Sequence, residues 1–413
     1  MIAADQISYA DLYARWEQGN WRATEIDLTV DRDQWENTFT DIERRGALWT
    51  YAMFFHGEDS VADNLSPYID AAPREEQKYF LATQQVDEAR HAVLFARFMR
   101  EVAGTGSDTG SSLEVTRPQL TWGFRKVFER LDRMAAELRR DRSKPKLAQA
   151  IALYHLVIEA ALAQPGQHYI EEGLTRRDLL PGFRQGIAHV SKDEQRHIAF
   201  GVKMIADLVR EDEDCLPAIE ELFREVVPFT TAVLVPPDWD ERYVTVFGFT
   251  LEDIFVHGSD ALDTRLRAAG LEPETMRTGI PFDVPGPERA RRALTLLRAG
   301  YLGAPNGPVV ADPEATALLF DGLRRQVNSS AVPGATIQWE FRDAEPWHMR
   351  IDNGATAVAP GRAEQPDLVF RCSFGDWVDL AAGRLDPRRA LLTGRIRPSG
   401  KLRMLARAPK LFM

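Results

Sequence analysis

Cysteine is scarce in this chain, which has only Cys215 and Cys372 among its 413 residues. Two cysteines so far apart argue against a disulfide framework and against a structural zinc site, which needs closely spaced thiolates. The N-terminus lacks a basic start followed by an apolar run, and no window has the uninterrupted apolar length of a membrane span. We therefore expect a cytoplasmic chain without a signal peptide or a transmembrane segment.

Basic charge is also in short supply. Lysine and arginine number 51 against 62 aspartates and glutamates, which gives a net charge of −11. An acidic chain is repelled by a phosphate backbone, so we expect no nucleic-acid partner. The hydrophobic share of 44% and the charged share of 27% are typical of a soluble globular protein, and the length suffices for two or three domains.

Apolar residues recur with a helical period from about residue 35 to 225. The pattern predicts helices at 40–65, 74–102, 117–139, 146–172 and 181–210, separated by proline- and glycine-containing breaks. Shorter helices are expected over 211–270. This part of the chain is predicted to be an all-α body.

The period changes from helical to two after residue 330. The runs around Ile337–Phe341 and Trp347–Ile351 predict a β-hairpin, and the run at 368–372 predicts a third strand before the helical spacing of 376–393. We expect a multidomain α and α+β protein. The predicted division is a helical domain over 1–285, a linker with a connecting helix over 286–309, and a small α+β domain over 310–413.

One pentapeptide occurs twice with a single change, as DEARH at 87–91 and DEQRH at 193–197. Positions i and i+3 share a helix face, so Glu88 and His91 can point at one atom, and so can Glu194 and His197. A single pair of this kind is weak evidence, because both residue types are common on solvated helix faces. Two further carboxylates at the same depth are needed to make a site.

Glu58 and Glu159 meet this requirement. Each follows bulky apolar residues, and a buried carboxylate needs a cation, a hydrogen-bond network or an exposed position. Glu58 and Glu88 are equally far from the predicted turn between their helices, and so are Glu159 and Glu194. In an antiparallel helix pair, residues equally far from the turn lie at the same height. Four glutamates and two histidines from four helices describe the ferritin-like dinuclear bundle, whose donors suit iron or manganese.

Aspartates precede both paired glutamates. Asp87 and Asp193 could each accept the free ring N–H of a ligand histidine, and the internal symmetry predicts that each serves the histidine of the opposite hairpin. The alternative for Asp87 is a solvated surface acid or a helix cap. The nearby His56, His155 and His168 lack the ligand spacing and are interpreted as packing or surface residues.

The segment from Gly57 to Phe98 and the stretch from Leu12 to Trp35 resemble the ribonucleotide reductase small subunit and, within that superfamily, the ligand-binding oxidases. The resemblance covers roughly the first 280 residues. It implies a manganese–iron or di-iron cluster beside a long-chain fatty acid. The ligands it implies are Glu58, Glu88, His91, Glu159, Glu194 and His197.

Further positions distinguish the ligand-binding oxidases from the reductase small subunit. The oxidases join a valine and a tyrosine by an ether crosslink, and the matching residues here are Val61 and Tyr154, which would otherwise pass as ordinary core. The reductase subunit usually has a radical tyrosine where this chain has Phe95. The resemblance therefore favours an oxidase, although some reductases also lack that tyrosine.

The C-terminal residues 346–354 and 365–412 resemble sterol-carrier-protein type 2 domains, which implies an apolar tunnel for acyl or sterol ligands. The module could instead serve dimerisation or docking. Our main hypothesis is an enzyme, an O₂-dependent dinuclear oxidase or oxygenase of a C–H bond in an apolar, fatty-acyl-like substrate. It would draw on an unknown electron donor and form a homodimer. The alternative is a lipid-binding or sensing protein with a single-turnover metal cofactor, and a reductase subunit is less favoured.

Overall fold

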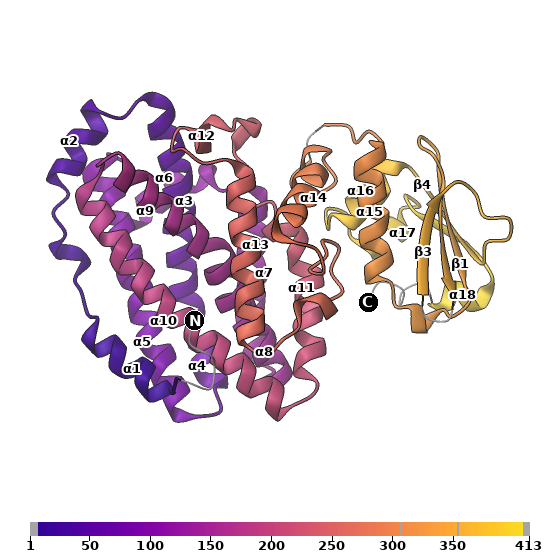
Figure 1. Cartoon of the computed structure of the whole chain (residues 1–413), viewed down its shortest axis with the longest axis horizontal. Coiled ribbons are helices and arrows are strands. Elements are labelled where there is room, and N and C mark those ends of the chain that lie inside the picture. Colours follow the sequence, from indigo (N-terminus) through magenta and orange to yellow (C-terminus); the bar gives the residue numbers. More distant parts are fainter. Residues whose placement is uncertain (1–6, 306, 353–354, 408–413) are drawn as a thin grey trace. The chain divides into compact units, whose positions relative to one another are not determined.

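The computed structural model describes residues 7–305, 307–352 and 355–407. The chain forms two compact units, each described by itself below (Figure 1). The first unit comprises Met1–Leu222 with Val233–Pro273, and the second comprises Phe223–Ala232 with Glu274–Met413. The boundaries at residues 285 and 310 stay a prediction.

The first unit is helical. Its α-helices are α1 (Tyr9–Gln18), α2 (Thr29–Asn37), α3 (Asp41–Asn64), α4 (Ser66–Ala71), α5 (Glu75–Arg97), α6 (Thr109–Thr116), α7 (Trp122–Leu138), α8 (Lys144–Ile151), α9 (Gln164–Arg176), α10 (Pro181–Glu211), α12 (Arg242–Thr245) and α13 (Leu251–Ala268). Two stretches are π-helical, η3 (Phe98–Val102) and η5 (Ala152–Ala163). Short 3₁₀ turns are η2 (Ala23–Glu25), η4 (Arg117–Gln119) and η6 (Pro237–Trp239). Helix α11 (Cys215–Thr230) and the turn η7 (Pro273–Thr275) contain two of the three points of division.

The five predicted helices are confirmed, with local differences. A separate short helix, α4, lies in the first hairpin between α3 and α5. The helix predicted over 146–172 is continuous from Lys144 to Arg177, but its central part is the π-helical η5. Extra residues of this kind in a helix recur at functional sites, and composition gives no signal for them.

Side chains fix the ends of the helices that enter the bundle centre. Thr40 and Glu43 form a reciprocal capping box at the start of α3. At the start of α10, buried Asp31 accepts hydrogen bonds from the backbone N–H groups of Gly182 (2.9 Å) and Phe183 (2.6 Å). These contacts satisfy N–H groups that have no partner within their own helix.

The helix Lys144–Arg177 is long and apolar enough to cross a membrane by length and composition alone, with a mean hydropathy of 1.3. Within the first unit, however, 78% of the apolar window is buried. A buried central helix of a globular bundle has the same composition, because its neighbours cover all its faces.

The second unit contains a mixed sheet with helices. Its elements are α14 (Gly286–Arg298), α15 (Pro313–Gln326), η8 (Ser329–Ala331), β1 (Thr336–Phe341), β2 (Trp347–Asp352), β3 (Ala355–Pro360), β4 (Leu368–Cys372), α16 (Phe374–Ala381), α17 (Pro387–Leu392), β5 (Arg397–Gly400) and α18 (Leu402–Arg407). The strand order is β3-β2-β1-β4-β5. The predicted hairpin β1–β2 is antiparallel, and the predicted third strand, β4, runs parallel to β1. The predicted α+β class is confirmed.

Two edge strands were not predicted. Strand β3 pairs with β2 along its length, and β5 pairs with β4. Strand β3 has the sequence ATAVAP, whose small residues give little alternation in hydrophobicity, and β5 has only four residues, RPSG. Edge positions tolerate proline and glycine because one side of the strand needs no backbone partner.

Candidate metal centre

Four neighbouring helices supply the candidate ligands. Helix α3 carries Glu58, α5 carries Glu88 and His91, η5 carries Glu159, and α10 carries Glu194 and His197. Helix α3 packs along α5, and α10 packs along η5. All six residues are at least 95% buried. The structure therefore brings together every ligand candidate of the sequence.

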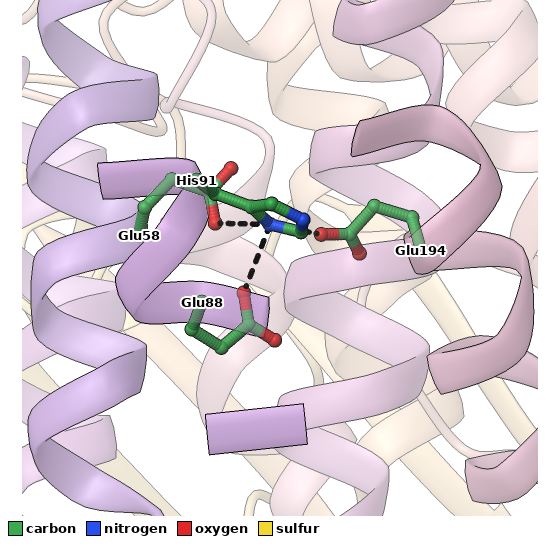
Figure 2. A group of neighbouring side chains, drawn as sticks. All are labelled: Glu58, Glu88, His91 and Glu194. Atoms are coloured by element: carbon green, nitrogen blue, oxygen red, sulfur yellow. Dashed lines mark hydrogen bonds and ion pairs between the residues drawn. The ribbon is translucent and has the colours of Figure 1, made fainter. Parts of the chain in front are cut away.

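His91 is the centre of the first group. Its Nδ1 atom lies 3.4 Å from Oε2 of Glu58, 3.4 Å from Oε2 of Glu88 and 3.6 Å from Oε1 of Glu194. Figure 2 shows the three carboxylates converging on the imidazole ring, with Glu194 reaching it from α10. One donor atom from each of the four residues lies within 4.8 Å of the other three.

His197 is the centre of the second group. Its Nδ1 atom lies 3.2 Å from Oε1 of Glu88, 3.5 Å from Oε1 of Glu159 and 3.9 Å from Oε2 of Glu194. These four donor atoms also lie within 4.8 Å of one another. Glu88 and Glu194 belong to both groups, and each turns one oxygen to His91 and the other to His197. A carboxylate placed in this way can bridge two cations.

Several buried polar atoms of the two groups have no hydrogen-bond partner, and this bears on whether cations fit between the ligands. Among the described residues, Oε2 of Glu159, Oε2 of Glu194 and Nδ1 of His197 are buried and have no hydrogen-bond partner. Leaving such atoms unpaired is costly, and four carboxylates in one apolar interior repel one another. Two divalent cations with hard oxygen and imidazole donors would satisfy both demands, so the residues fit a dinuclear site.

The same crowding shifts the acidity of the glutamates. Burial raises the pKa of Glu58 to about 7, against the opposing attraction of His91. Burial likewise raises the pKa of Glu159 to about 8, against the opposing attraction of His197. Desolvation penalises the charged form, and a nearby cation would reverse that penalty.

The outer nitrogen of each histidine faces an aspartate of the opposite hairpin. Nε2 of His91 lies 3.1 Å from Oδ2 of Asp193, and Nε2 of His197 lies 3.1 Å from Oδ2 of Asp87. Both aspartates are about 99% buried. With the N–H held outward by a carboxylate, the inner Nδ1 keeps its lone pair for a cation.

Two arginines, which the sequence reasoning missed, join the aspartates into a closed ring. Arg196 donates to Asp87 at 2.7 Å and to Asp193 at 2.8 Å, while Arg90 pairs with Asp87 and lies 3.0 Å from Asp193. Each arginine stands directly before the histidine in its pentapeptide, so the repeat itself contained the signal. Burial opposes ionisation, but the hydrogen bond and charge of His91 and the charge of Arg196 hold the pKa of Asp193 well below its usual range.

Indole N–H groups from the N-terminal segment complete this network. Nε1 of Trp16 donates to Asp87 at 2.9 Å, and Nε1 of Trp21 donates to Asp193 at 2.8 Å. Nothing in the sequence near either tryptophan indicates the role, because the contacts join residues 71 and 172 positions apart.

A glutamine, a tyrosine and a histidine line the side of the centre nearest η5. Nε2 of Gln84 donates to Glu159 at 2.7 Å, and the Tyr154 hydroxyl donates to Glu88 at 2.9 Å. His155 is fully buried, lies 3.1 Å from the amide oxygen of Gln84, and packs where Gly201 allows α10 to approach closely. Its packing role matches the interpretation from sequence.

An apolar cavity lies beside the carboxylates within the first unit. Glu58, Glu88, Glu159 and Glu194 face it together with Val61. The rest of its wall is almost entirely apolar, formed by Met53, Phe54, Gly57, Phe124, Phe128, Ile158, Leu162, Ala163, Val233 and Leu234. The cavity can hold a hydrocarbon next to the ligand set and keep water away from it.

The N-terminal part of the chain matches a known protein family. Residues 4–234 match the family described as ribonucleotide reductase, small chain, and residues 325–412 match the SCP-2 sterol transfer family. The first match covers more than half of the chain, and both confirm the resemblances stated from sequence.

Solved structures with the same fold include an R2-like ligand-binding oxidase from Sulfolobus acidocaldarius. It is 23% identical with a TM-score of 0.55, over 69% of this chain and 94% of that one. A tyrosine-to-phenylalanine variant of an R2-like ligand-binding oxidase, with aerobically reconstituted Mn/Fe cofactor, is 23% identical with a TM-score of 0.56, over 64% and 93% of the two chains. A likeness at this identity concerns the fold, and it confirms the ferritin-like class of the first unit. On the family match, this chain belongs to the ribonucleotide reductase small chain family and carries an SCP-2 domain near its C-terminus.

Proposed function

We propose that the chain is an oxidoreductase with a dinuclear iron or manganese–iron site, which uses O₂ to oxidise a C–H bond of an apolar, fatty-acyl-like substrate. The observation that carries the proposal is the pair of overlapping four-residue groups facing one apolar cavity. The Mn/Fe cofactor of the structurally similar oxidases supports the choice of metals.

The six side chains divide into terminal and shared ligands. Glu58 and His91 would hold one cation, Glu159 and His197 the other, and Glu88 and Glu194 would bridge the two. When bound, a pair of such metals supplies the reduction of O₂ and the removal of hydrogen from an unactivated C–H bond. As an oxygenase, the protein would put one oxygen atom into the substrate and release the other as water, with two electrons and two protons from an external donor.

The surrounding residues prepare this chemistry. Asp87 and Asp193 fix the histidine tautomers and hold the outer ring protons, because each accepts from one Nε2. The wall formed by Phe54, Phe128 and Ile158 binds the hydrocarbon and excludes water from the reacting bond. The substrate would thus be oriented by shape and burial, with few polar contacts.

The ligand assignment is tested by metal content. Glu58→Gln keeps the shape of the side chain but removes the charge, so bound iron plus manganese should fall well below two per chain. Glu43→Gln is the matched control, because Glu43 is a buried glutamate on the same helix that contacts Thr40 and Arg177. A Glu58→Gln protein that still holds two metals would remove Glu58 from the site.

An ether crosslink between Val61 and Tyr154 is part of the proposal. Val61 lines the cavity, and the Tyr154 hydroxyl lies 2.9 Å from Glu88. The bond would form between a Val61 carbon and the phenol oxygen, with loss of one C–H and one O–H hydrogen and transfer of two electrons to O₂. Peptide mass spectrometry after aerobic metal loading should show the two peptides joined with two hydrogens lost. Two free peptides would reject the crosslink.

A second candidate is a lipid-binding or sensing protein with a single-turnover cofactor, which the SCP-2 match favours. Oxygen consumption separates the candidates. With reductant and a fatty acid present, an oxidase consumes O₂ in proportion to added substrate, whereas a sensor stops after about one turnover per site. A reductase subunit is disfavoured by buried Phe95, which stacks on Phe54, and a catalytic large subunit should give no stimulation.

A further inference from the structure

A second cavity in the first unit shares one wall residue, Leu234, with the cavity beside the carboxylates. Gly166 of the second cavity lies against Phe54 of the first, so closely that an added Cβ would be 2.8 Å from the Phe54 ring. Leu234 and the contact between Gly166 and Phe54 therefore separate two compartments. A hydrocarbon in the first cavity and another molecule in the second can be bound at the same time.

The wall of the second cavity is rich in aromatic rings. Six of its fourteen lining residues are aromatic, against three of fifteen in the first cavity, so the second suits a planar ring better than a flexible chain. The rings of Trp49 and Tyr243 meet edge-on with centroids 5.9 Å apart, and those of Tyr169 and Phe249 lie 4.4 Å apart. The six aromatic residues are Trp49, Tyr51, Tyr169, Tyr243, Phe247 and Phe249.

The polar groups of the second cavity favour a ligand that carries hydroxyl groups. The Tyr169 hydroxyl donates to the carbonyl oxygen of Asp253 at 2.8 Å, and the Thr50 hydroxyl donates to that of Gly46 at 3.0 Å. Each hydroxyl has a single hydrogen, so it can offer a ligand only the lone pairs that accept. Nε1 of Trp49 is buried without a hydrogen-bond partner in the described part of the chain, and a ligand oxygen would satisfy it.

The second cavity is close enough to the metal centre for electron transfer. Tyr51 in its wall and the ligand Glu58 are seven residues apart on α3, so they share a helix face and are about 10 Å apart along the axis. Tyr51 packs against Phe183 with ring centroids 4.6 Å apart, and Phe183 packs against Phe95 at 5.6 Å. Phe95 in turn stacks on Phe54 of the first cavity at 5.8 Å. Electrons can cross such a packed interior without contact between donor and metal.

We propose that the second cavity binds a hydroquinone, which is the electron donor of the metal centre. The inference rests on the proposed function, which needs two electrons and two protons for each O₂. A hydroquinone loses two electrons and both hydroxyl protons and leaves as the quinone. O₂ takes up these electrons and protons, so that one oxygen atom enters the substrate C–H bond and the other leaves as water. The quinone has no O–H to donate to Tyr169 and Thr50, which favours its release.

Binding is measured on the metal-free full chain, where no turnover occurs. Anaerobic calorimetric titration with tetramethylhydroquinone should show one site per chain. Ile254→Trp adds a ring to the cavity from α13 and should weaken binding about tenfold or more. Glu252→Trp, exposed on the same helix and outside the cavity wall, is the control and should bind as the wild type does. No binding by the wild type, or equal affinity in Ile254→Trp, would overturn the inference.

A conservative variant tests the hydrogen bond without filling the cavity. Tyr169→Phe keeps the ring and removes the acceptor, so the affinity for tetramethylhydroquinone should fall, and it should fall more than the affinity for the corresponding quinone. An unchanged affinity for the hydroquinone in this variant would also overturn the inference.

Reduction of the metal centre tests the role of the bound hydroquinone. After aerobic metal loading and removal of O₂, stopped-flow absorbance should show a reduction rate that saturates with tetramethylhydroquinone in the wild type and is lower in Ile254→Trp. Dithionite, which needs no such cavity, should reduce both proteins at the same rate. A centre that dithionite reduces but the hydroquinone does not would overturn this inference alone. A centre that neither donor reduces would overturn the proposed function and this inference with it.

Discussion

Nε2 of His91 on α5 lies 3.1 Å from Oδ2 of Asp193 on α10. The contact crosses from one Glu-x-x-His helix to the other, and Asp87 repeats it with His197 at the same distance. Each aspartate thereby orients a histidine on the opposite helix. The two halves of the centre are bound to each other through their outer contacts as well as through shared glutamates.

Asp193→Asn should weaken metal binding without removing a ligand. The amide no longer accepts the ring proton as a carboxylate does, and loss of such a partner costs about 10–100-fold in metal affinity. Competition with a chelator measures the loss. Asp31→Asn is the control, because Asp31 is equally buried but caps α10 away from the ligands. Equal affinity in the Asp193→Asn and wild-type proteins would contradict the role.

Arg196→Gln should destabilise the metal-free protein by about 3–5 kcal/mol, because it leaves two buried aspartates short of a charged partner. Urea denaturation followed by circular dichroism measures the free energy of unfolding. Arg184→Gln on the same helix is the control, since its partner Asp178 is 91% exposed and such pairs contribute about 0–1 kcal/mol. A similar decrease in the free energy of unfolding in the two variants would mean that the ring of aspartates and arginines does not stabilise the fold.

Metal affinity should rise with pH up to about 8. Burial raises the pKa of Glu58 to about 7 and that of Glu159 to about 8, so a proton must leave each carboxyl before its oxygen can bind a cation. Each displaced proton contributes about a tenfold change in affinity per pH unit. Titration with Mn²⁺ in buffers across this range measures it. An affinity that does not change with pH would contradict these protonation states.

The raised pKa values also fix the direction in which stability depends on pH. A carboxyl with a higher pKa in the folded state favours folding below its unfolded value of about 4.5, and this contribution is lost as pH rises through 7 to 8. The metal-free protein should therefore lose thermal stability as the pH rises toward 8. Added metal should increase the thermal stability most at this pH. Calorimetric scans with and without metal measure both effects.

Gly57→Leu should block the hydrocarbon cavity while leaving both metals bound. Gly57 lines the cavity, and a Cβ added there meets only Phe128, at 3.5 Å, which is ordinary contact. Gly57→Ala is thus the tolerated control, and the larger leucine would occupy the space of the proposed acyl chain. Mass spectrometry of extracted lipid should show loss of a copurified acyl chain in Gly57→Leu alone. Equal lipid in both variants would place the chain elsewhere.

The sequence predicted what repeats locally and missed what depends on distant contacts. The helices and the hairpin follow from periodicity, and the six ligand candidates follow from one repeat and two isolated acids. Trp16 and Trp21 reach the aspartates from another part of the chain, so no local pattern marks them. The π-helical η5 packs against α10, where Gly201 meets His155, and no local pattern in the sequence indicates its π-helical course.

We propose that six side chains of the bundle hold two metal ions. Crystals of aerobically purified protein, measured by anomalous diffraction at the iron and manganese edges, test it most directly. Two peaks are expected, one among Glu58, Glu88, His91 and Glu194, and one among Glu88, Glu159, Glu194 and His197. A single peak, a peak outside these groups, or no iron or manganese in the bundle would contradict it.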